Sequence, residues 1–505
     1  MKLASSENIR FIDKEIEYKH NTPSIVLMEN AGRSIAEKMT QLFSKQSKIC
    51  VLVGSGNNGG DGLVVARHLL NNGCQKVHVV ICSTSLSKDG QTNYDILKTY
   101  RDVEIYTIKT LEKAKKILWS SEVIIDSLLG IGVNKEVTGI YAEIIDLINQ
   151  KKDAKVISVD IPSGLKACGS LSKWPTVKAD HTITLEFPKE NMLIYPHKKV
   201  VGKLHVVDIG IPKMVRDRVR PSSYQVTANF VKKLLPKHRE DSHKGDYGTG
   251  IVLGGNTNMA GAVKLSSLAA VRMGIGVLHT IVPNEIKNTV QNYMPENITW
   301  AIDYSKSRSS LNDTAKVLTK SDAMALGMGM GTKSNDQFFE KLILSYKKPL
   351  VVDGDGLNLL SKLPKGVIKS NWVLTPHPKE MSRLTGLEVS DIVENPVEVC
   401  KHYSKQFNCT LVLKGASTVI CSPKGIAFIN TSGNKSLSKG GSGDVLTGVI
   451  LSLICAGATP LAAAISGVYI HGLSSDLLLE SQNYRGILPS DVANHLPKAI
   501  NSITQ

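Results

Sequence analysis

The fold of this chain is decided first by residues 49–62, which read ICVLVGSGNNGGDG. Five apolar residues lead into a turn rich in glycine and asparagine, and residues 62–72 then carry the apolar spacing of a helix. A strand that enters a helix through such a turn directs free backbone N–H groups and the positive end of the helix at an anion. We therefore expect an α/β unit with a nucleotide site near the start of the chain.

A second glycine-rich stretch, residues 439–444, reads KGGSGD and directly precedes the apolar residues 445–455. The glycines lead straight into a helix that carries Asp444 in its first turn. The positive helix end is expected to keep this carboxylate ionised. Asp444 could then accept a proton from a hydroxyl that attacks a phosphate, while the N–H groups of residues 441–443 bind the developing charge. Two glycine-rich turns of different design predict two nucleotide sites on two domains.

Composition limits the function classes. The chain has 505 residues, 42% hydrophobic and 21% charged, as in a globular protein with two full-sized domains. The net charge is +16, but the lysines are dispersed and aromatic residues make up only 5%, so nucleic-acid binding is disfavoured. The N-terminus lacks a signal-peptide core, and polar residues interrupt residues 445–473, so we expect buried helices and no membrane span. Eight cysteines at scattered spacings predict reduced thiols in a cytoplasmic protein.

Both halves of the chain alternate strand and helix patterns, as parallel sheets require. A charged, proline-bearing segment at residues 211–223 separates them, and we expect domains at residues 1–222 and 223–505. The first half predicts a doubly wound α/β domain, with helices at residues 23–43 and 62–72 and strands at 48–53, 76–82, 103–108, 122–126, 155–160, 181–187 and 204–209. The second half predicts a helix at 259–272 and strands at 250–254, 276–282, 323–327, 349–353, 372–375, 410–414, 419–422 and 425–430.

A dinucleotide-dependent dehydrogenase is the first alternative, because Gly54, Gly56 and Gly59 match the spacing of its fingerprint. Such a site needs an acidic residue at the end of the second strand to hold the ribose. Residues 79–83 read VVICS and contain no carboxylate. The dehydrogenase interpretation is therefore disfavoured.

Two other strand ends carry carboxylates. Asp126 precedes the glycine turn SLLGIG, and Asp160 precedes IPSG. Ligands of open α/β sheets bind at the carboxyl ends of strands, so both aspartates are expected to converge there with Asn58 and Ser163. The oxygens of these side chains suit a hard cation. Either aspartate alone is explained as well by capping the turn after it, but both beside residues 57–62 favour a functional site.

The motifs of the first half resemble those of the YjeF N-terminal domain family. The resemblance rests on LMENAGR at residues 27–33 and on residues 54–62, 126–132 and 160–164, and it covers about residues 1–215. Members of that family are NAD(P)H-hydrate epimerases, which interconvert the R and S forms of hydrated NAD(P)H. The resemblance implies a K⁺ ion held by Asn58, Asp126 and Ser163, and acid–base work by Asp160 and Lys189 near the hydrated ring carbon. It also implies contacts of the hydrated nucleotide with Asn57, Asn58, Gly59, Gly60, Asp61, Gly130, Ile131, Gly132, Val133, Asn134, Lys135, Glu136 and Asp160.

A Gly-Ser-Gly-Asp string alone is often only a helix cap, but three companions strengthen the second site. They are VDGDGL at residues 352–357, TPHPKE at 375–380 and KGAST at 414–418. With HKGDYG at 243–248 and GGNTNMAGA at 254–262, these motifs resemble the ribokinase-like fold and, within it, the ADP-dependent NAD(P)HX dehydratases. The resemblance covers about residues 225–500. Residues 434–438 read NKSLS, where many members carry NPGMA.

The dehydratase resemblance implies a reaction and a set of site residues. ADP, bound with Mg²⁺, phosphorylates the ring hydroxyl of S-NAD(P)HX, and elimination of phosphate regenerates NAD(P)H and leaves AMP. Asp444 would act as the base. The adenine nucleotide would be held by Lys414, Gly415, Ala416, Ser417, Thr418 and Gly443. The hydrated cofactor would be contacted by Ala262, Gly329, Gly331, His377 and Asp444.

The sequence therefore favours a bifunctional metabolite-repair enzyme, an isomerase joined to a lyase. We expect a cytoplasmic homo-oligomer that acts on NAD(P)HX and has no nucleic-acid or membrane partner. Two alternatives stay open: a vitamin or sugar kinase with an N-terminal regulatory domain, and a non-catalytic nucleotide-binding module. Asp160 and Asp444 together disfavour the second, since a pure binder needs no carboxylate beside phosphate. The choice between ADP and ATP, and between NADHX and NADPHX, is left open as well.

Overall fold

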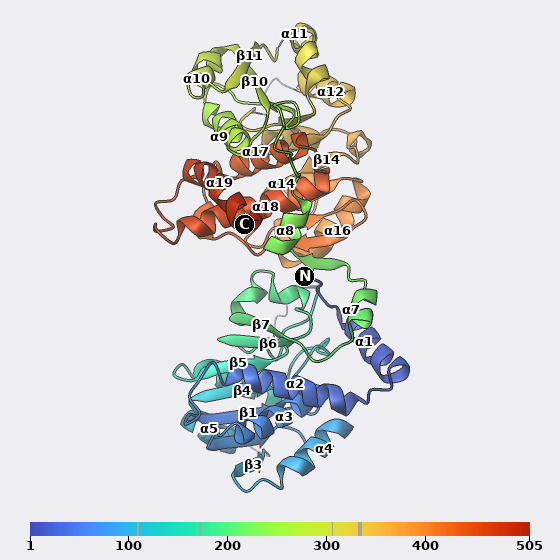
Figure 1. Ribbon diagram of the computed structural model, residues 1–505, viewed down its shortest axis with the longest axis vertical. Helices are drawn as coiled ribbons and strands as arrows, with labels where there is room; N and C mark the ends of the chain where they lie inside the picture. Colours follow the sequence, from blue (N-terminus) through green and yellow to red (C-terminus); the bar gives the residue numbers. More distant parts are fainter. Residues whose placement is uncertain (109–110, 171–173, 306, 332–335) are drawn as a thin grey trace. The chain divides into compact units, whose positions relative to one another are not determined.

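The computed structural model describes residues 1–108, 111–170, 174–305, 307–331 and 336–505. Within these residues the chain forms two compact units, Lys2–Ser223 and Tyr224–Gln505, the second of which also contains Met1. Figure 1 shows both units with their helices and strands labelled. Each unit has its own sheet and its own core, so each is described by itself.

The first unit is built, in its described part, on a seven-stranded sheet. The strand order is β3-β2-β1-β4-β5-β6-β7, and all neighbouring pairs are parallel. The order reverses between β1 and β4, which is where open sheets of this kind bind ligands. The strands are β1 (Lys48–Val53), β2 (Lys76–Ile81), β3 (Val103–Thr107), β4 (Val123–Ser127), β5 (Lys155–Val159), β6 (His181–Leu185) and β7 (Lys203–Val207).

Helices cover both faces of this sheet. They are α1 (Ser6–Lys19), α2 (Ser24–Met39), α3 (Asn57–Asn71), α4 (Lys88–Leu97), α5 (Leu111–Ser120), α6 (Gly139–Gln150) and α7 (Lys213–Arg218), with short 3₁₀ turns η1 (Glu190–Met192) and η2 (His197–Val200). Met39 of α2 and Leu63 of α3 belong to the core on one face, and Ile144 of α6 belongs to the core on the other. The two cores use alternate residues of β1, Val51 in one and Leu52 in the other. The predicted doubly wound fold is therefore confirmed.

The second unit contains a ten-stranded sheet within the described residues. Its order is β11-β10-β9-β12-β13-β14-β15-β16-β17-β8. Neighbours from β11 to β15 are parallel, whereas β16 is antiparallel to both β15 and β17. The strands are β8 (Ser223–Gln225), β9 (Thr249–Leu253), β10 (Val277–Pro283), β11 (Asn297–Ile302), β12 (Ala323–Leu326), β13 (Leu350–Val352), β14 (Trp372–Leu374), β15 (Thr410–Leu413), β16 (Val419–Cys421) and β17 (Ala427–Ile429).

Helices of the second unit enclose its sheet. They are α8 (Ala228–Leu234), α9 (Ala260–Arg272), α10 (Lys287–Gln291), α11 (Ser307–Lys320), α12 (Asp336–Ser345), α13 (Asp355–Leu360), α14 (Pro378–Thr385), α15 (Val389–Glu394), α16 (Pro396–Gln406), α17 (Ser442–Cys455), α18 (Pro460–Leu478) and α19 (Pro489–Thr504). The 3₁₀ turns are η3 (Asn284–Ile286), η4 (Lys365–Val367) and η5 (Lys435–Leu437). Helices α8, α9, α17, α18 and α19 share one core with the sheet, and α16 packs on β15 and β16.

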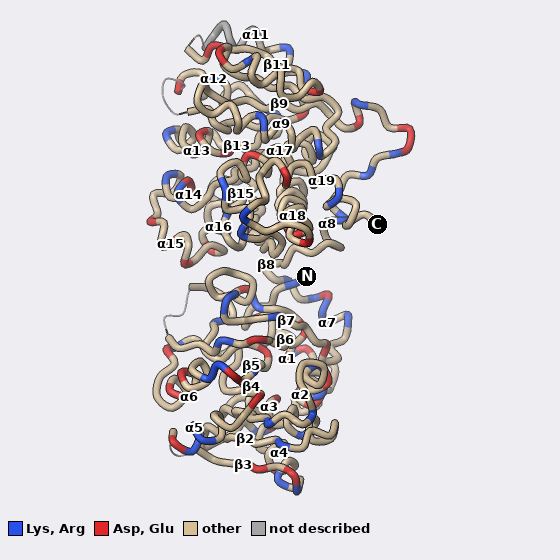
Figure 2. Tube along the Cα trace, turned by 90° about the vertical axis from the view of Figure 1, so that its left-hand side faces the viewer, with Lys and Arg blue, Asp and Glu red and all other residues tan. Residues whose placement is uncertain are grey.

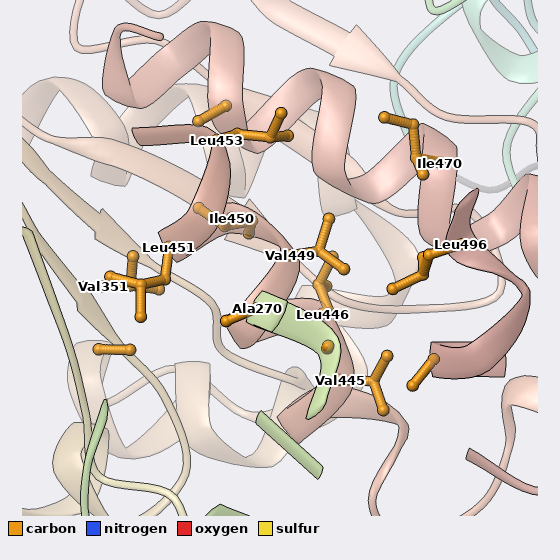
Figure 3. Close-up of a cluster of buried hydrophobic side chains, with 14 of the residues drawn as sticks. Ala270, Val351, Val445, Leu446, Val449, Ile450, Leu451, Leu453, Ile470 and Leu496 are labelled. Carbon is orange, nitrogen blue, oxygen red and sulfur yellow. The ribbon is translucent and has the colours of Figure 1, made fainter. Parts of the chain in front are cut away.

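Helix α17 lies in the middle of this core. In Figure 3 its side chains Val449 and Leu451 lie among Val351 of β13, Ile470 of α18 and Leu496 of α19. The prediction of buried helices over residues 445–473 is therefore confirmed. By length and composition α18 passes as a membrane span, but 67% of its apolar window is buried inside the unit, as in the core helix of a globular domain.

Charged side chains are dispersed over both units. Figure 2 shows lysine and arginine interspersed with aspartate and glutamate along the trace of each unit. The net charge of +16 is therefore not gathered into one stripe of the trace. That the chain has no nucleic-acid partner stays a prediction.

The glycine turn after β1 differs from its prediction, because α3 begins at Asn57 and not at residue 62. The residues expected to form a loop are the first turn of the helix itself. A Cβ built on Gly59 would lie 2.1 Å from the carbonyl oxygen of Gly54. Glycine at this position lets the helix start directly against the end of the strand, which a side chain would prevent.

Among the elements that were not predicted, strand β11 and helix α7 show why. Strand β11 has Ile298 and Trp300 exposed at 48% and 37%, so an apolar–polar alternation does not mark its buried face. Helix α7 lies in the segment expected to separate the domains. Its Val215 is buried and its Arg216 forms an ion pair with Glu186 at 3.0 Å, so α7 packs as part of the first unit.

Candidate active sites

A cavity of about 1000 Å³ lies at the carboxyl ends of the strands in the first unit. Its wall is formed by the segments that follow β1, β4, β5 and β6, together with residues of α1 and α2. The strand order reverses at this edge, as it does at the ligand crevice of open α/β sheets. Predicted site residues that line the cavity are Asn57, Asn58, Asp61, Gly130, Ile131, Gly132, Val133, Asn134, Lys135, Glu136, Asp160 and Lys189.

The three predicted cation ligands are brought together beside this cavity. Asp126 is the second-to-last residue of β4 and is fully buried. Its carboxylate accepts hydrogen bonds from the Ser163 Oγ at 2.5 Å, the Ser163 N–H at 2.9 Å and the Ser158 Oγ at 2.8 Å. Leu129 links Asn58, the third predicted ligand, to Ser163. Its N–H donates to Ser163 Oγ at 2.8 Å, and its carbonyl accepts a hydrogen bond from Asn58 Nδ2 at 3.0 Å. Burial raises the pKa of Asp126, although these hydrogen bonds oppose the shift.

One atom of this cluster points to a ligand that the chain does not supply. The Asn58 Oδ1 atom is buried and accepts no hydrogen bond from the described residues. An orphaned buried acceptor costs free energy unless a donor or a cation reaches it. Nor does Asp126 form an ion pair within the described residues, so its charge has no cationic partner there. Amide, carboxylate and hydroxyl oxygens are the donors that hard cations prefer, and these residues therefore fit K⁺.

Asp160 and Lys189 form a buried ion pair at the floor of the cavity. The Lys189 side chain is 1% exposed, and its Nζ also donates to Thr184 Oγ1 at 2.8 Å. Asp160 Oδ1 accepts further from the Leu185 N–H at 3.0 Å. Its φ of 60° lies in the left-handed region, which is uncommon for a residue with a side chain and concentrates at functional sites. The carboxylate is thereby fixed with an ammonium group beside it.

Of the remaining residues of the glycine turn, Asp61 faces the cavity, whereas Gly59 and Gly60 pack against the protein. Asp61 lines the cavity, and burial, followed by the charge of Asp160, raises the pKa of Asp61 well above its ordinary value. Gly59 packs on Gly54, while a Cβ on Gly60 would lie 2.5 Å from Met28 Cε. These two glycines therefore serve close packing of α3, and their contact with a ligand stays a prediction.

Sequence reasoning missed part of the cavity wall. Asp13 and Glu17 of α1 and Glu186 after β6 line it. The two α1 residues are spaced by one helical turn and alternate with the buried Ile12 and Ile16, a spacing that could have placed them on one side of the helix. Nothing in the local sequence indicates Glu186, because only the sheet brings the end of β6 to this cavity.

The second unit gathers a polar cluster at its own strand ends. Asp353 follows β13 and is buried, and its Oδ1 lies 2.5 Å from Lys414 Nζ at the end of β15. Thr447 of α17 donates from Oγ1 to Asp353 Oδ2 at 2.9 Å. Burial opposes ionisation of Asp353, but the charge of Lys414 and the hydrogen bonds from Lys414, Thr375 and Thr447 together lower the pKa of Asp353 below its ordinary value. Neither Asp353 nor Thr447 was predicted as a site residue, although Asp353 ends a strand as Asp126 and Asp160 do.

Gly443 and Asp444 lie beside this ion pair. A Cβ on Gly443 would be 3.2 Å from Lys414 Nζ and 3.4 Å from Asp353 Oδ2. Burial, followed by the charge of Asp353, raises the pKa of Asp444 to about 7. The expectation that Asp444 stays fully ionised is therefore wrong at neutral pH, because burial and the charges of neighbouring carboxylates raise its pKa. At neutral pH the carboxyl group is about half ionised, which suits a general base.

His377 is the N-cap of α14 and shares a capping box with Glu380. Its Nδ1 accepts from the N–H groups of Lys379 at 3.1 Å and Glu380 at 3.2 Å, and Glu380 Oε2 accepts from the His377 N–H at 2.8 Å. In the neutral ring the proton therefore sits on Nε2, 3.4 Å from Glu380 Oε1. Burial lowers the pKa of His377 and raises the pKa of Glu380 to about 7. Only Nε2 is left for the predicted ligand contact.

The other predicted residues of this site occupy three turns. A Cβ on Gly329 would lie 2.9 Å from the Cβ of Ala262, so the structure brings these two together. The Gly331 N–H donates to Asp355 Oδ2 at 2.7 Å, so that group is already used. In the turn of residues 414–418, Gly415 and Ala416 are exposed and Ser417 and Thr418 are half-buried, which leaves the turn open to a ligand.

Comparison with known proteins gives the same division of the chain. A model of the YjeF-related protein N-terminus matches residues 24–191, and a model of NAD(P)H-hydrate dehydratase matches residues 250–498. The bifunctional NAD(P)H-hydrate repair enzyme of Moorella thermoacetica is 32% identical over 518 residues, covering 100% of this chain and 98% of that protein. The enzyme of the same name from Thermofilum pendens is 34% identical over 514 residues, covering 100% and 97%.

A solved ribokinase-like superfamily protein from Enterococcus faecalis V583 is 23% identical, covers 56% of this chain and 97% of its own, and has a TM-score of 0.50. This likeness confirms the ribokinase-like fold predicted for the second half. The two units thus carry an epimerase-type domain followed by a dehydratase-type domain, and relatives with both cover the whole chain. The chain belongs to the family of bifunctional NAD(P)H-hydrate repair enzymes.

Proposed function

We propose that this chain repairs hydrated NAD(P)H through two activities. The unit Lys2–Ser223 epimerises R- and S-NAD(P)HX, and the unit with Tyr224–Gln505 dehydrates S-NAD(P)HX at the expense of ADP, giving AMP and phosphate. The observation that carries this proposal is full-length similarity to bifunctional repair enzymes, with a built carboxylate site at the strand ends of each unit. Since hydration yields both epimers and a dehydratase consumes one, an epimerase on the same chain lets both be recovered.

In the first site, oxygens of Asn58, Asp126 and Ser163 would hold K⁺. The support is the orphaned Asn58 Oδ1 and a buried Asp126 carboxylate that accepts hydrogen bonds from neutral donors. K⁺ supplies positive charge that offsets Asp126 and attracts the phosphates of the nucleotide. Asn57 and the turn of residues 130–136 would line the space that the nucleotide fills.

Asp160 and Lys189 are proposed as the acid–base pair of the epimerase. The Lys189 ammonium group can give a proton to the hydroxyl of the hydrated carbon, so that the C–O bond breaks and water leaves while the ring nitrogen supplies its electron pair. Water then adds to the opposite face and loses a proton to Asp160, which returns it to Lys189 through their direct contact. The low exposure of Lys189 excludes bulk water from this transfer.

Asp444 is proposed as the base of the dehydratase. It takes the proton of the ring hydroxyl while that oxygen attacks the β-phosphorus of ADP and the bond to AMP breaks. The N–H groups of Gly441 and Gly443 would bind the charge that develops on phosphate, whereas the Ser442 N–H already donates to the Lys439 carbonyl at 3.2 Å. Lys414 adds positive charge beside Gly443. Departure of phosphate from the ring carbon, with loss of a proton from the neighbouring carbon, restores NAD(P)H.

Mg²⁺ is proposed to enter this site as the chelate of ADP. Among the described residues no group of three His, Cys, Asp or Glu side chains could hold a metal ion. The carboxylates of Asp353 and Glu380 already face Lys414 and His377. We therefore assign no protein ligand to Mg²⁺ and expect EDTA to abolish ADP use without altering the fold.

A mixture of R- and S-NADHX tests the proposal directly. The return of NADH absorbance is followed with ADP, ATP or no nucleotide. We expect recovery of both epimers with ADP, recovery of only the S fraction for Asp160→Asn, and no recovery for Asp444→Asn. Recovery of the S fraction alone by the unaltered protein would remove the epimerase assignment. A stable phosphorylated product would favour the kinase alternative.

Donor choice, assembly and location are proposed on the family alone. The ratio of the rates with ADP and with ATP in the same assay tests the preference for ADP. Parallel assays with NADHX and NADPHX test which substrate is preferred. We expect a homo-oligomer in the cytoplasm, which light scattering coupled to size-exclusion chromatography and cell fractionation test. Partners other than these small molecules are not expected.

A further inference from the structure

A lysine opens the glycine loop of the second site but does not point at its anion site. Lys439 directly precedes Gly440 and Gly441, the position from which a lysine would be expected to reach a bound phosphate. Its Nζ instead donates to the carbonyls of Tyr484 at 3.4 Å, Arg485 at 2.8 Å and Ile487. A lysine ammonium group has three N–H bonds, so these three acceptors use all of them.

The carbonyls belong to a segment far along the chain, residues 484–487, which joins α18 to α19. Ile487 is fully buried, and Arg485 Nε donates to the Tyr484 hydroxyl at 3.1 Å. The Lys435 ammonium group lies 3.7 Å from the centre of the Tyr484 ring, a distance typical of a cation–π contact. Lys435 stands where many members of the resembled family carry proline, so this contact belongs to the variant loop of this chain.

The same region packs directly on the glycine loop. Gly441 has a φ of 98°, and a Cβ there would lie 2.6 Å from Leu265 Cδ1 of α9 and 3.3 Å from Cγ of Pro489, the first residue of α19 and the second after the 484–487 segment. Gly441 is also the N-cap of α17, whose first turn carries Gly443 and Asp444. The 484–487 segment is thus joined to the glycine loop through Lys439 and leads directly to the α19 residue that packs on Gly441.

We propose that Lys439 is a positioning residue, which fixes the 484–487 segment against the glycine loop and so sets the geometry of the site for a nucleoside diphosphate. This inference rests on the proposed dehydratase function for its kinetic consequence. Its structural consequence, the ordering of residues 484–487, holds for the protein without ligand. Lys439 acts through the backbone and makes no contact with phosphate.

Three variants of the full chain test this role. In Lys439→Met the three carbonyls lose their donor, and we expect faster amide hydrogen exchange at residues 484–487 without ligand and a KM for ADP raised about tenfold, with kcat changed less than about twofold. Lys439→Arg retains donors on a side chain of similar reach and should restore most of both properties. Lys348→Met is the matched control, because Lys348 Nζ also donates to backbone carbonyls, those of Thr319 and Ser321, away from the glycine loop.

Each outcome decides the proposal. Faster exchange at residues 484–487 together with weaker ADP binding, in Lys439→Met only, supports it. A raised KM with unchanged exchange in the ligand-free protein would mean that Lys439 contacts phosphate directly, and unchanged KM and exchange would overturn the role altogether. If the unaltered protein shows no dehydratase activity, the proposed function fails, while exchange and calorimetric ADP binding still decide the role of Lys439.

Discussion

The two units bury a carboxylate at a strand end in different ways. Asp126 of the first unit accepts hydrogen bonds from neutral donors, and beside it lies the unpartnered Asn58 Oδ1. Asp353 of the second unit forms an ion pair with Lys414, whose Nζ lies 2.5 Å from Asp353 Oδ1. A buried carboxylate without a nearby cation is costly. Asp160 of the first unit is paired with Lys189, so the contrast concerns Asp126 alone: the proposed K⁺ would supply the cation that Lys414 supplies to Asp353.

The two sites are therefore expected to depend differently on ions in solution. In the second unit the Asp353–Lys414 pair lies against Gly443, so the built-in cation also supports the turn that carries Asp444. In the first unit Leu129 links Asn58 to Ser163 with no charged side chain.

The largest effect is expected at Asp444. Asp444→Asn removes the proposed base while keeping the size of the side chain, so we expect the dehydratase kcat to fall about 10³-fold, within the range for loss of a general base. Epimerisation, followed by NMR of an R-NADHX sample, should be unchanged. A loss of less than about tenfold would exclude Asp444 as the base. A parallel loss of epimerisation would mean that the two units do not act independently.

Breaking the built-in pair comes next. Asp353→Asn removes the closer carboxylate partner of the largely buried Lys414 ammonium group and leaves only Glu380 Oε2 at 3.9 Å. We expect the second unit to lose about 3 kcal/mol of unfolding free energy. Asp126→Asn removes only an acceptor of hydrogen bonds from neutral donors and should destabilise the first unit by about 1 kcal/mol without K⁺. Calorimetric unfolding, with each transition assigned through these variants, measures both. Equal losses would contradict the comparison.

The fold could be predicted from the sequence more fully than the sites. Apolar runs that end in glycine or aspartate marked most strands, and β1, β4 and β5 placed Asp126 and Asp160 at one sheet edge. The start of α3 at Asn57 was missed, because the close approach of Gly59 to Gly54 is a tertiary contact. Local patterns carry no information on such approaches.

Side-chain direction was the other limit. Motif reasoning selected Lys414 and His377 but could not show that Lys414 pairs with Asp353 or that His377 Nδ1 caps α14. The pKa of Asp444 follows from burial and from Asp353, which is distant in sequence. These properties arise only when strand ends from separate segments meet.

A smaller effect is expected from exchanging ions. Replacing K⁺ by choline should lower epimerisation about tenfold, equal to about 1.4 kcal/mol, because Asn58 Oδ1 and Asp126 lose their cation. The dehydratase should change less than about twofold, since Lys414 is covalently present. NADH recovery from pure S-NADHX and NMR epimerisation of R-NADHX measure the two. Asp126→Asn is the control, because it should make epimerisation insensitive to K⁺. Equal sensitivity of the epimerase and the dehydratase to K⁺ would contradict the proposed difference between the two sites.

The smallest effect is expected from pH. Since the pKa of Asp444 is raised from 3.8 to about 7, the proposed base gains its charge through neutrality, and kcat of the dehydratase should rise about twofold from pH 7 to pH 8. The folded state binds this proton more tightly than the unfolded chain. Asp444 therefore lowers the stability of the second unit as pH rises from about 4 to 7 and contributes no further change above that range.

The groups that set this pH dependence are Asp353, Lys414, Asp355 and Glu380. Because Glu380 also has a pKa of about 7, Glu380→Gln separates the two titrations: a rise in kcat that persists in this variant belongs to Asp444. A rise that disappears with Glu380 would assign the titration to Glu380 and leave Asp444 ionised throughout. In that case Lys414 would fully offset the effect of the Asp353 charge on Asp444. The pKa of Asp444 would then lie below the value of about 7 that burial and Asp353 indicate.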